Sequence, residues 1–345
     1  MFGSSRITRT VLALAAATAL VTSTAACGSA SSGGGEHAQH DAGFPVSITS
    51  ALGTTEIKAR PERVVTLGWG STEAAIALGV PPAGMRDMSS ELGKDAGGIM
   101  PWVQEKLGDA KPVLLPESSK SLPLEQIAAL KPDVILSVQA GLTADQYAQL
   151  SKIAPTVAQP GRNWQTSWQD QTTLVGKALG REAEAKTLIA DTDKRIAAVK
   201  AAHPEFAGKT VAAASGTTPE SLNFYFDTDP RVMLLQSFGF TVLPELTALR
   251  EATPPGKFAA PVSWENVPKY NADVLTSWYL DPAQRAATEA NPSFASLKAV
   301  QRKSYVALTD PPLVYAVSSP NVLDLPWLLD RYVPTLSAAA KNVAG

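Results

Sequence analysis

Residues Thr166 to Lys209 read TSWQDQTTLVGKALGREAEAKTLIADTDKRIAAVKAAHPEFAGK and predict two helices in succession. The spacing of Thr166 and Gln169 predicts a capping box at the start of the first helix, and Gly180 ends it. Apolar residues at three- and four-residue steps predict a second helix over Glu182 to Ala202. At ~1.5 Å per residue, about 21 residues give a rod of about 30 Å. Such a helix would either span two lobes or cover a single core.

Similar helix-to-strand units occur on both sides of this stretch. Glu125 is followed eight residues later by Asp133, and Glu265 is followed eight residues later by Asp273, with matching hydrophobic positions between them. Self-similarity of this kind indicates duplicated architecture, although any two such units share some features. We therefore predict an α/β fold with two Rossmann-like lobes, each with a parallel sheet, joined by a long linker helix. The predicted boundaries are 44–165 for the N-terminal lobe, 166–208 for the linker and 209–345 for the C-terminal lobe.

The composition is that of a globular protein. The chain has 345 residues, 45% of them hydrophobic and 18% charged, and its formal net charge is −2. This length suggests two domains, and no basic stripe is present. Nucleic acid is therefore not expected as a partner.

The first residues predict a targeting segment. Arg6 and Arg9 precede an apolar run from Val11 to Val21 that is too short to cross a bilayer, and Ala25-Ala26 suits a cleavage site. Cleavage after residue 26 would expose Cys27, the only cysteine, in a pattern that resembles a bacterial lipoprotein signal. We expect an exported chain anchored through lipid on Cys27, including palmitate, with residues 27–43 as a flexible tether. The alternative is a plain secretory signal followed by a free thiol.

Parallel sheets bind ligands beyond the carboxyl ends of their strands, so residues after successive strands predict a cleft. Several of them are Trp or Tyr, whose polar tips suit a partly wet pocket, although each could instead pack on its own lobe. The candidate ligand-binding residues are Trp69, Ser71, Arg86, Gln139, Arg162, Trp164, Ser215, Tyr225, Trp278, Tyr279 and Tyr315.

Catalytic and metal-binding patterns are not found in the sequence. Apart from His37 and His40 in the predicted tether, the only histidine is His203, near the end of the second helix. A Ser-His-Asp or Cys-His site is therefore hard to build, and first-row metals need clustered ligands. We expect no enzyme, no cofactor and no metal site, with His203 facing water. Any iron would be bound only as a chelate.

The order and spacing of several motifs resemble a known family. They are Pro61 to Val65, Ser71 to Glu73 with Ala77 to Gly79, Gly97 to Val103, Leu124 to Ile135, the linker helix, and Ser263 to Glu265. In these motifs the chain resembles the substrate-binding lipoproteins of ABC importers, in the branch with a rigid helical linker that receives iron-siderophores, haem and cobalamin. The resemblance implies a class III periplasmic-binding-protein-like fold.

The resemblance also implies a function and partners. We expect a monomeric, lipid-anchored solute-binding protein on the outer face of the cell membrane that captures a ferric siderophore for the ABC permease. Haem or cobalamin is the alternative within the same class, and an exported enzyme acting on a metal chelate is the alternative from another class. Small lobe movement on binding is expected, because one helical crossing restricts hinge motion.

In that family a glutamate on each lobe docks into arginines of the permease. Glu73 and Glu265 match, each expected at the start of a helix. A carboxylate there is favoured by the helix dipole and remains open to a cationic partner. The alternative is a dipole match with no docking role.

Overall fold

The computed structural model describes residues 43–93, 96–118 and 121–343, which belong to one compact unit. The predicted signal peptide, Cys27 and the tether up to residue 42 lie outside the described residues. Within these ranges, no helix is both long enough and apolar enough to cross a membrane.

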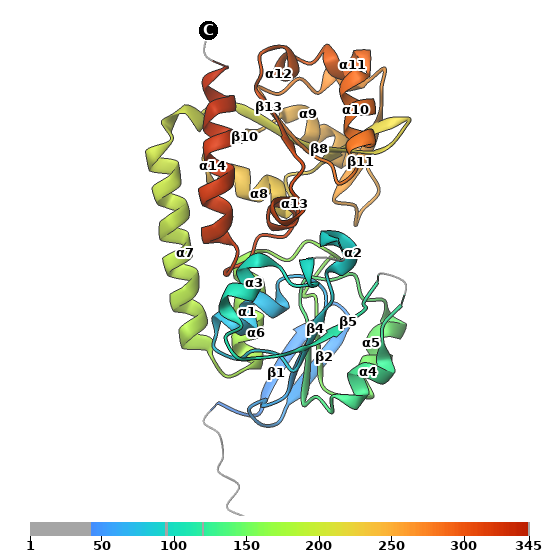
Figure 1. Cartoon of the computed structure of the whole chain (residues 1–345), viewed down its shortest axis with the longest axis vertical. Coiled ribbons are helices and arrows are strands. Elements are labelled where there is room, and N and C mark those ends of the chain that lie inside the picture. Colours follow the sequence, from blue (N-terminus) through green and yellow to red (C-terminus); the bar gives the residue numbers. More distant parts are fainter. Residues whose placement is uncertain (1–42, 94–95, 119–120, 344–345) are drawn as a thin grey trace, which may run out of the picture. The chain divides into compact units, whose positions relative to one another are not determined.

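The first lobe is built on a five-stranded parallel sheet of strand order β5-β4-β3-β6-β7 (Figure 1). Its strands are β3 (Val64–Thr66), β4 (Gly84–Arg86), β5 (Val113–Leu115), β6 (Val134–Ser137) and β7 (Thr156–Ala158). Its helices are α1 (Ser71–Ala77), α2 (Ser89–Leu92), α3 (Pro101–Lys106), α4 (Leu124–Ala129) and α5 (Ala144–Ser151). This parallel sheet with its connecting helices confirms the predicted α/β pattern.

An antiparallel hairpin precedes this sheet and was not predicted. It pairs β1 (Val46–Ser50) with β2 (Gly53–Ile57). Ile48 and Ile57 are buried in one cluster with core residues of the first lobe. The hairpin strands contain five residues each with only alternate positions buried, so their apolar signal is weak.

Two helices form the connection between the lobes, as predicted. They are α6 (Trp168–Ala178) and α7 (Glu182–Ala202). Ala185 of α7 belongs to a core cluster of the first lobe, whereas Ile196 belongs to a cluster that contains second-lobe residues such as Phe238. Helix α7 also contacts α8 and α14 of the second lobe, which agrees with a linker helix. The predicted boundaries of the two lobes stay a prediction.

The predicted capping box at Thr166 and Gln169 is wrong by one residue. Ser167 is the N-cap of α6, and its Oγ accepts a hydrogen bond of 3.1 Å from the amide of Asp170. Thr166 Oγ1 instead donates to the carbonyl oxygen of Val138 at 2.7 Å. The two hydroxyl residues are adjacent, and the bond to Val138 takes Thr166 out of the capping position.

The second lobe has a mixed sheet, which corrects the predicted parallel one. Its order is β11-β9-β8-β12-β13, with β10 also paired to β8. The strands are β8 (Thr210–Thr218), β9 (Ser221–Tyr225), β10 (Thr241–Val242), β11 (Ala259–Ser263), β12 (Val274–Trp278) and β13 (Tyr305–Leu308). Strand β8 turns back directly into β9, which therefore runs antiparallel to it, and β11 runs antiparallel to β9.

Helices cover this sheet and close the chain. They are α8 (Pro230–Ser237), α9 (Pro244–Glu251), α10 (Pro282–Ala290), α11 (Pro292–Ala295), α12 (Lys298–Gln301), α13 (Pro311–Ser318) and α14 (Leu325–Lys341). The last helix, α14, contains two prolines. Pro326 lies in the first turn of α14, where its missing N–H costs nothing, and the helix continues through Pro334.

One apolar core cluster contains residues of both lobes. It includes Met85 and Trp102 from the first lobe and Leu328 from the second, and the rings of Trp102 and Trp327 lie 5.1 Å apart between centroids. The lobes therefore share a continuous apolar contact beside the linker. This contact is consistent with small lobe movement, which stays a prediction.

The two repeated aspartates have the same structural role. The Asp133 carboxylate accepts hydrogen bonds of 2.8 and 2.9 Å from the amides of Glu62 and Arg63, just before β3. The Asp273 carboxylate accepts bonds of 2.9 Å from the amide and the hydroxyl of Thr210, the first residue of β8. In each lobe, the aspartate that precedes one strand, β6 or β12, thus fixes the start of the neighbouring strand, β3 or β8.

Replacement of either aspartate should lower stability. Asp133→Ala and Asp273→Ala each leave backbone donors unpaired, and we expect the free energy of unfolding to fall by about 1–2 kcal/mol. Urea titration followed by circular dichroism measures this change. Asp133→Asn and Asp273→Asn keep an acceptor and should lose less. Unchanged urea midpoints in both alanine variants would contradict the assigned role.

Glu205 links the end of α7 to α14. Ser337 donates a hydrogen bond to its carboxylate at 2.5 Å, and His203 lies 2.9 Å from the same oxygen. These contacts lower the pKa of Glu205 to about 2. His203 also stacks on Phe206 at 5.1 Å, so it is half-buried and does not simply face water as expected.

This lowered pKa predicts a pH-dependent contribution to stability. The contribution is complete above the ordinary pKa of about 4.5 and is lost as the pH falls toward about 2. Glu205→Gln should therefore lower the free energy of unfolding by about 2 kcal/mol at pH 7, and the difference from the parent should shrink in acid. Urea titrations at pH 7 and about pH 3 test this expectation. An equal difference at both pH values would contradict it.

Candidate functional site

The loop after β3 holds Trp69 in a fixed position. Gly68 and Gly70 have φ angles of 69° and 75°, in the left-handed region that favours glycine. A side chain on Gly68 would come within 2.7 Å of the carbonyl oxygen of Gln139. The amide of Trp69 donates to that same oxygen at 2.9 Å. The backbone at 68–70 is therefore tied to the loop after β6, which places the indole at the carboxyl end of the first sheet.

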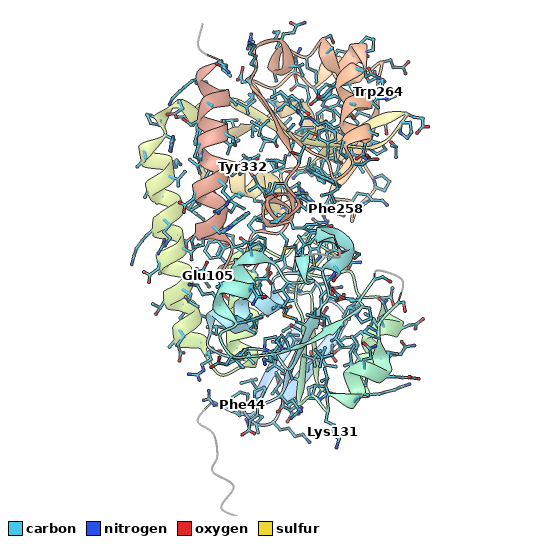
Figure 2. All side chains as sticks on the ribbon, in the orientation of Figure 1. Phe44, Glu105, Lys131, Phe258, Trp264 and Tyr332 are labelled. Atoms are coloured by element: carbon cyan, nitrogen blue, oxygen red, sulfur yellow. The ribbon has the colours of Figure 1, made fainter. Side chains whose placement is uncertain are left out.

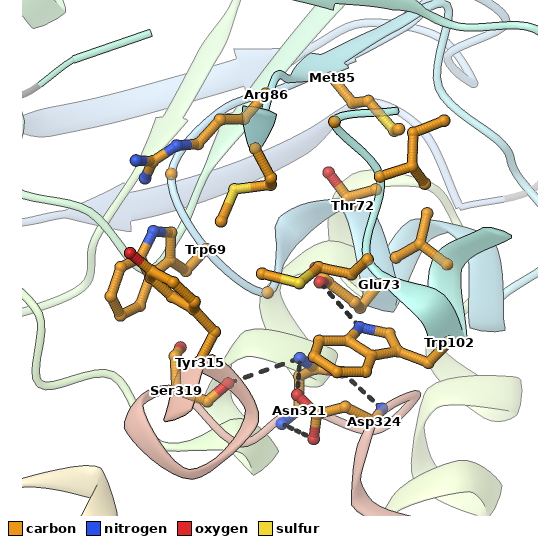
Figure 3. A pocket seen from close by; sticks show the side chains of 17 residues that line it. Trp69, Thr72, Glu73, Met85, Arg86, Trp102, Tyr315, Ser319, Asn321 and Asp324 are labelled. Atoms are coloured by element: carbon orange, nitrogen blue, oxygen red, sulfur yellow. Dashed lines mark hydrogen bonds between the residues drawn. The ribbon is translucent and has the colours of Figure 1, made fainter. Parts of the chain in front are cut away.

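Trp69 contacts aromatic residues of both lobes. Its ring centroid lies 5.5 Å from that of Trp164 and 5.4 Å from that of Tyr315, which meets it edge-on. Tyr315 belongs to α13 in the second lobe. Figure 3 shows Tyr315 beside Trp69. Three of the predicted ligand-binding aromatics thus lie together.

Gln139 supports Trp164. Its side chain is 1% exposed, its amide nitrogen donates to the carbonyl of Trp164 at 3.3 Å, and its amide oxygen accepts from the amide of Thr166 at 2.9 Å. Trp164 itself has a φ angle of 62°, which costs a non-glycine residue free energy. Gln139 was predicted to bind the ligand directly, but its side-chain amide is used to position Trp164.

Arg86 lies next to Trp69. Its guanidinium carbon is 5.9 Å from the Trp69 ring centroid, and its Nη2 forms an ion pair of 2.5 Å with Glu91. The Arg86 side chain is 14% exposed. This arginine combines a stacked cation with a fixed carboxylate partner.

Arg231 repeats this arrangement in the second lobe. Its guanidinium carbon is 4.3 Å from the Tyr225 ring centroid, and its Nη1 donates to both carboxylate oxygens of Asp229 at 3.0 and 3.1 Å. The Arg231 side chain is 11% exposed. The sequence analysis did not select Arg231, although the Asp-Pro-Arg that starts α8 after a strand was a usable signal.

The predicted residues Ser215, Tyr225 and Trp278 form a network behind Arg231. The Tyr225 hydroxyl lies 3.1 Å from Ser215 Oγ and accepts a bond of 3.0 Å from Trp278 Nε1. Phe258, labelled in Figure 2, stacks on the Tyr225 ring at 6.3 Å. Because their polar atoms are paired with one another, these side chains hold the Tyr225 ring against Arg231 and are not open to a ligand.

Three cavities share Trp69 as a wall. The inner cavity, of about 40 Å³, is lined by Glu73, Met85, Arg86, Tyr315 and Asp324 among others. The first-lobe cavity, of about 360 Å³, includes Arg86, Glu91, Glu117, Gln146 and Trp164. The inter-lobe cavity, of about 210 Å³, includes Gln139, Trp164, Asp229, Arg231 and Phe258. A ligand there would contact side chains of both lobes.

Three further predicted ligand-binding residues, like Ser215, Tyr225 and Trp278, line none of the three cavities. Ser71 is fully buried, and its Oγ accepts a hydrogen bond from the amide of Val138 at 3.2 Å. Tyr279 is 1% exposed, and Tyr305 of the neighbouring strand donates to its hydroxyl at 3.1 Å. Successive residues of a strand point to opposite faces, so Tyr279 turns away from the face that Trp278 occupies. Arg162 is exposed but lines none of the three cavities.

The carboxyl groups near Trp69 are largely withdrawn from water. Burial raises the pKa of Glu117, whose carboxylate accepts a bond of 2.9 Å from the amide of Gly68. Burial also raises the pKa of Glu73, which accepts a bond of 3.2 Å from Trp102 Nε1, and it raises the pKa of Asp324 strongly. Burial raises the pKa of Tyr315 to about 12, so this hydroxyl is neutral at pH 7.

Three buried N–H groups at these cavities have no hydrogen-bond partner in the described part of the chain. They are Trp69 Nε1, Arg86 Nε and Arg231 Nε. Buried donors of this kind are almost always paired. Across the described ranges there is also no group of three or more His, Cys, Asp or Glu residues that could hold a metal ion. The site therefore offers hydrogen-bond donors and aromatic surface.

Comparisons with known proteins agree with this architecture. The profile of a family described as periplasmic binding protein matches residues 64–312. The chain is 32% identical to the probable siderophore-binding lipoprotein YfiY of Bacillus subtilis, over 66% of this chain and 67% of YfiY. It is 29% identical to the ferric enterobactin-binding periplasmic protein FepB of Escherichia coli, over 77% of this chain and 85% of FepB. The solved structure of Streptococcus pneumoniae PiaA in complex with ferrichrome is 31% identical, with a TM-score of 0.77 over 86% of this chain and 99% of PiaA.

Proposed function

The chain belongs to the periplasmic binding protein family, and we propose that it captures a ferric siderophore for an ABC importer. The family is one of substrate-binding proteins. The relatives YfiY and FepB are named as siderophore-binding and ferric enterobactin-binding proteins, and PiaA was solved in complex with ferrichrome. These relatives support the same ligand class for this chain.

The three unpartnered N–H donors carry the proposal. Trp69 Nε1 and Arg86 Nε lie in the first lobe and Arg231 Nε lies in the second. A ferric siderophore holds its iron through oxygen atoms that keep partial negative charge, so these atoms can accept such hydrogen bonds. Each buried donor left unpaired costs free energy, which a ligand oxygen would recover.

The aromatic walls suit the remainder of such a ligand. The rings of Trp69, Trp164 and Tyr315 present flat apolar surface beside the donors. Ligand sites are typically apolar and aromatic with a few polar groups that fix orientation. The carbon framework of a chelate would pack on these rings while its oxygens face the arginines.

Haem and cobalamin fit these residues less well. Haem iron takes axial ligands such as His, Cys, Met or Tyr. The Tyr225 hydroxyl is occupied by Ser215 and Trp278, Tyr279 is buried against Tyr305, and His203 stacks on Phe206 near the end of the linker. Tyr315 and three methionines line the inner cavity, but its volume of about 40 Å³ is too small for a macrocycle. The names of the relatives above do not favour these two ligands either.

We also propose an extracytoplasmic location with a lipid anchor on Cys27. The support is the sequence pattern around Cys27 and the naming of the relative YfiY as a lipoprotein. A tether between the anchor and the folded unit would let the receptor reach its permease.

For the contact with the permease, we propose Glu125 and Glu265 in place of the predicted pair of Glu73 and Glu265. Glu73 is half-buried and accepts a hydrogen bond from Trp102, so its carboxylate is occupied inside the inner cavity. Glu125 is exposed in the first turn of α4, and Glu265 is exposed in a turn before a short 3-10 helix rather than in a helix as expected. Each precedes the repeated aspartate by eight residues, so the two occupy equivalent positions in the two lobes.

The two cavity arginines should decide ligand affinity. We expect saturable quenching of tryptophan fluorescence by a ferric siderophore, because Trp69 and Trp164 line the site. Arg86→Ala and Arg231→Ala should each raise the Kd about 10- to 100-fold, because each removes one or two hydrogen bonds from a charged group to the ligand. Arg162→Ala is the matched control, since Arg162 is exposed outside the cavities.

Circular dichroism melting of each variant separates lost binding from lost folding. Saturable binding of haem or cobalamin without binding of any ferric siderophore would overturn the proposed function. Equal loss of affinity in Arg162→Ala and Arg86→Ala would overturn the assignment of the site.

The two exposed glutamates should affect transport and not capture. Glu125→Ala and Glu265→Ala should leave the Kd for the chelate unchanged and lower uptake of radioactive iron about tenfold in cells that depend on this receptor. Glu182→Ala removes an exposed glutamate from the first turn of α7 and serves as the control. Normal uptake by the Glu125→Ala, Glu265→Ala double variant would contradict the docking role.

A further inference from the structure

The described residues that line the cavities around Trp69 include more acidic than basic groups. Among the described residues that line the three cavities, only Arg86 and Arg231 are basic. The acidic residues that line the same cavities are Glu73, Glu91, Glu117, Asp229 and Asp324. A site built to attract a strongly anionic ligand would show the opposite balance.

Both arginines already have a carboxylate partner. Arg86 is paired with Glu91 at 2.5 Å, and Arg231 contacts both oxygens of Asp229. The side chains of Glu91 and Asp229 are 15% and 1% exposed, so water screens these pairs poorly. Each pair is neutral as a unit, so the guanidinium groups offer a ligand N–H donors without a net positive charge.

The other three carboxyl groups at these cavities, Glu73, Glu117 and Asp324, have no arginine or lysine in an ion pair among the described residues. Glu117 accepts a hydrogen bond from the amide of Gly68 and lines the first-lobe cavity, and Glu73 and Asp324 line the inner cavity. Their interactions are hydrogen bonds from Gly68, Trp102 and Asn321. Each of them is neutral when protonated and repels an anionic ligand when ionised.

Ferric siderophores differ in net charge for a simple chemical reason. Three hydroxamate groups are three monoanions, which balance Fe³⁺ and leave an uncharged centre. Catecholates are dianions, so three of them leave a large excess of negative charge, and citrate-type carboxylate ligands also leave an excess. All classes present oxygens to a donor, but only the hydroxamate class does so without bringing net negative charge to these carboxylates.

We infer that the cleft selects ferric trihydroxamates of zero or positive net charge over anionic catecholate and citrate-type chelates. This inference rests on the proposed function and names the ligand class of the same site. The donors of Trp69, Arg86 and Arg231 bind hydroxamate oxygens, and the aromatic rings pack on the carbon arms. The cleft residues supply no net positive charge to balance an anionic chelate, and any carboxylate that is ionised repels it.

The test compares chelates of different charge on the same protein. Ferrichrome is uncharged, ferrioxamine B carries a positive ammonium group, and ferric enterobactin and ferric dicitrate are anionic. By fluorescence quenching, the first two should bind about 100-fold more tightly than the anionic pair. Added salt should strengthen binding of the anionic chelates, because it screens repulsion.

Two variants identify the groups responsible. Glu91→Gln and Glu117→Gln each remove one carboxylate, and each should lower the ratio of the Kd for ferric enterobactin to that for ferrichrome about tenfold. Glu182→Gln, on the exposed surface of α7, should leave this ratio unchanged. Circular dichroism melting checks that each variant is folded.

The outcomes separate this inference from the proposed function. Binding of ferric enterobactin or ferric dicitrate within tenfold of ferrichrome, or more tightly than ferrichrome, would overturn the inference while the role as a siderophore receptor stands. An unchanged Kd ratio in both Glu91→Gln and Glu117→Gln would also overturn it. Failure to bind any of the four chelates would overturn the proposed function itself.

Discussion

The tight backbone turn at Gly68–Gly70 determines the geometry of the cleft, because it fixes Trp69. The left-handed conformations of the two glycines and the bond from the amide of Trp69 to Gln139 fix the backbone from which the indole extends. From there it contacts Trp164 in its own lobe and Tyr315 in the other, and it forms a wall of three cavities. A short turn in the first lobe thus positions the side chain that contacts aromatic residues of both lobes.

Two similar groups of side chains meet at this cleft. In each lobe an arginine lies near an aromatic ring and is held by a buried carboxylate, with Arg86 and Glu91 in the first lobe and Arg231 and Asp229 in the second. The ion pairs fix both guanidinium groups before a ligand arrives, which lowers the entropy cost of binding. The same pairs neutralise the arginines, so recognition relies on hydrogen bonding and aromatic contact more than on net charge. Rigid groups of this kind suit a receptor whose lobes share apolar core beside the linker.

The sequence predicted those features that depend on local patterns. The linker helices follow from the apolar residues at three- and four-residue steps after Thr166. The equivalence of Asp133 and Asp273 follows from their spacing to a preceding glutamate. Features that depend on tertiary contacts were missed. The β8–β9 hairpin makes the second sheet mixed where a parallel sheet was expected, and the burial of Tyr279 depends on its contact with Tyr305 of β13. Arg231 could not be separated from other arginines at helix starts until the fold brought it beside Tyr225.

The most direct test of this account is the position of iron in a crystal structure of the chain with a bound ferric trihydroxamate. The anomalous signal of iron locates the metal independently of the chelate. The account places the iron in the cleft among Trp69, Arg86 and Arg231, with chelate oxygens within hydrogen-bond distance of at least one of the two arginine Nε atoms. Iron bound elsewhere, or in the cleft with neither arginine contacting the chelate, would contradict it.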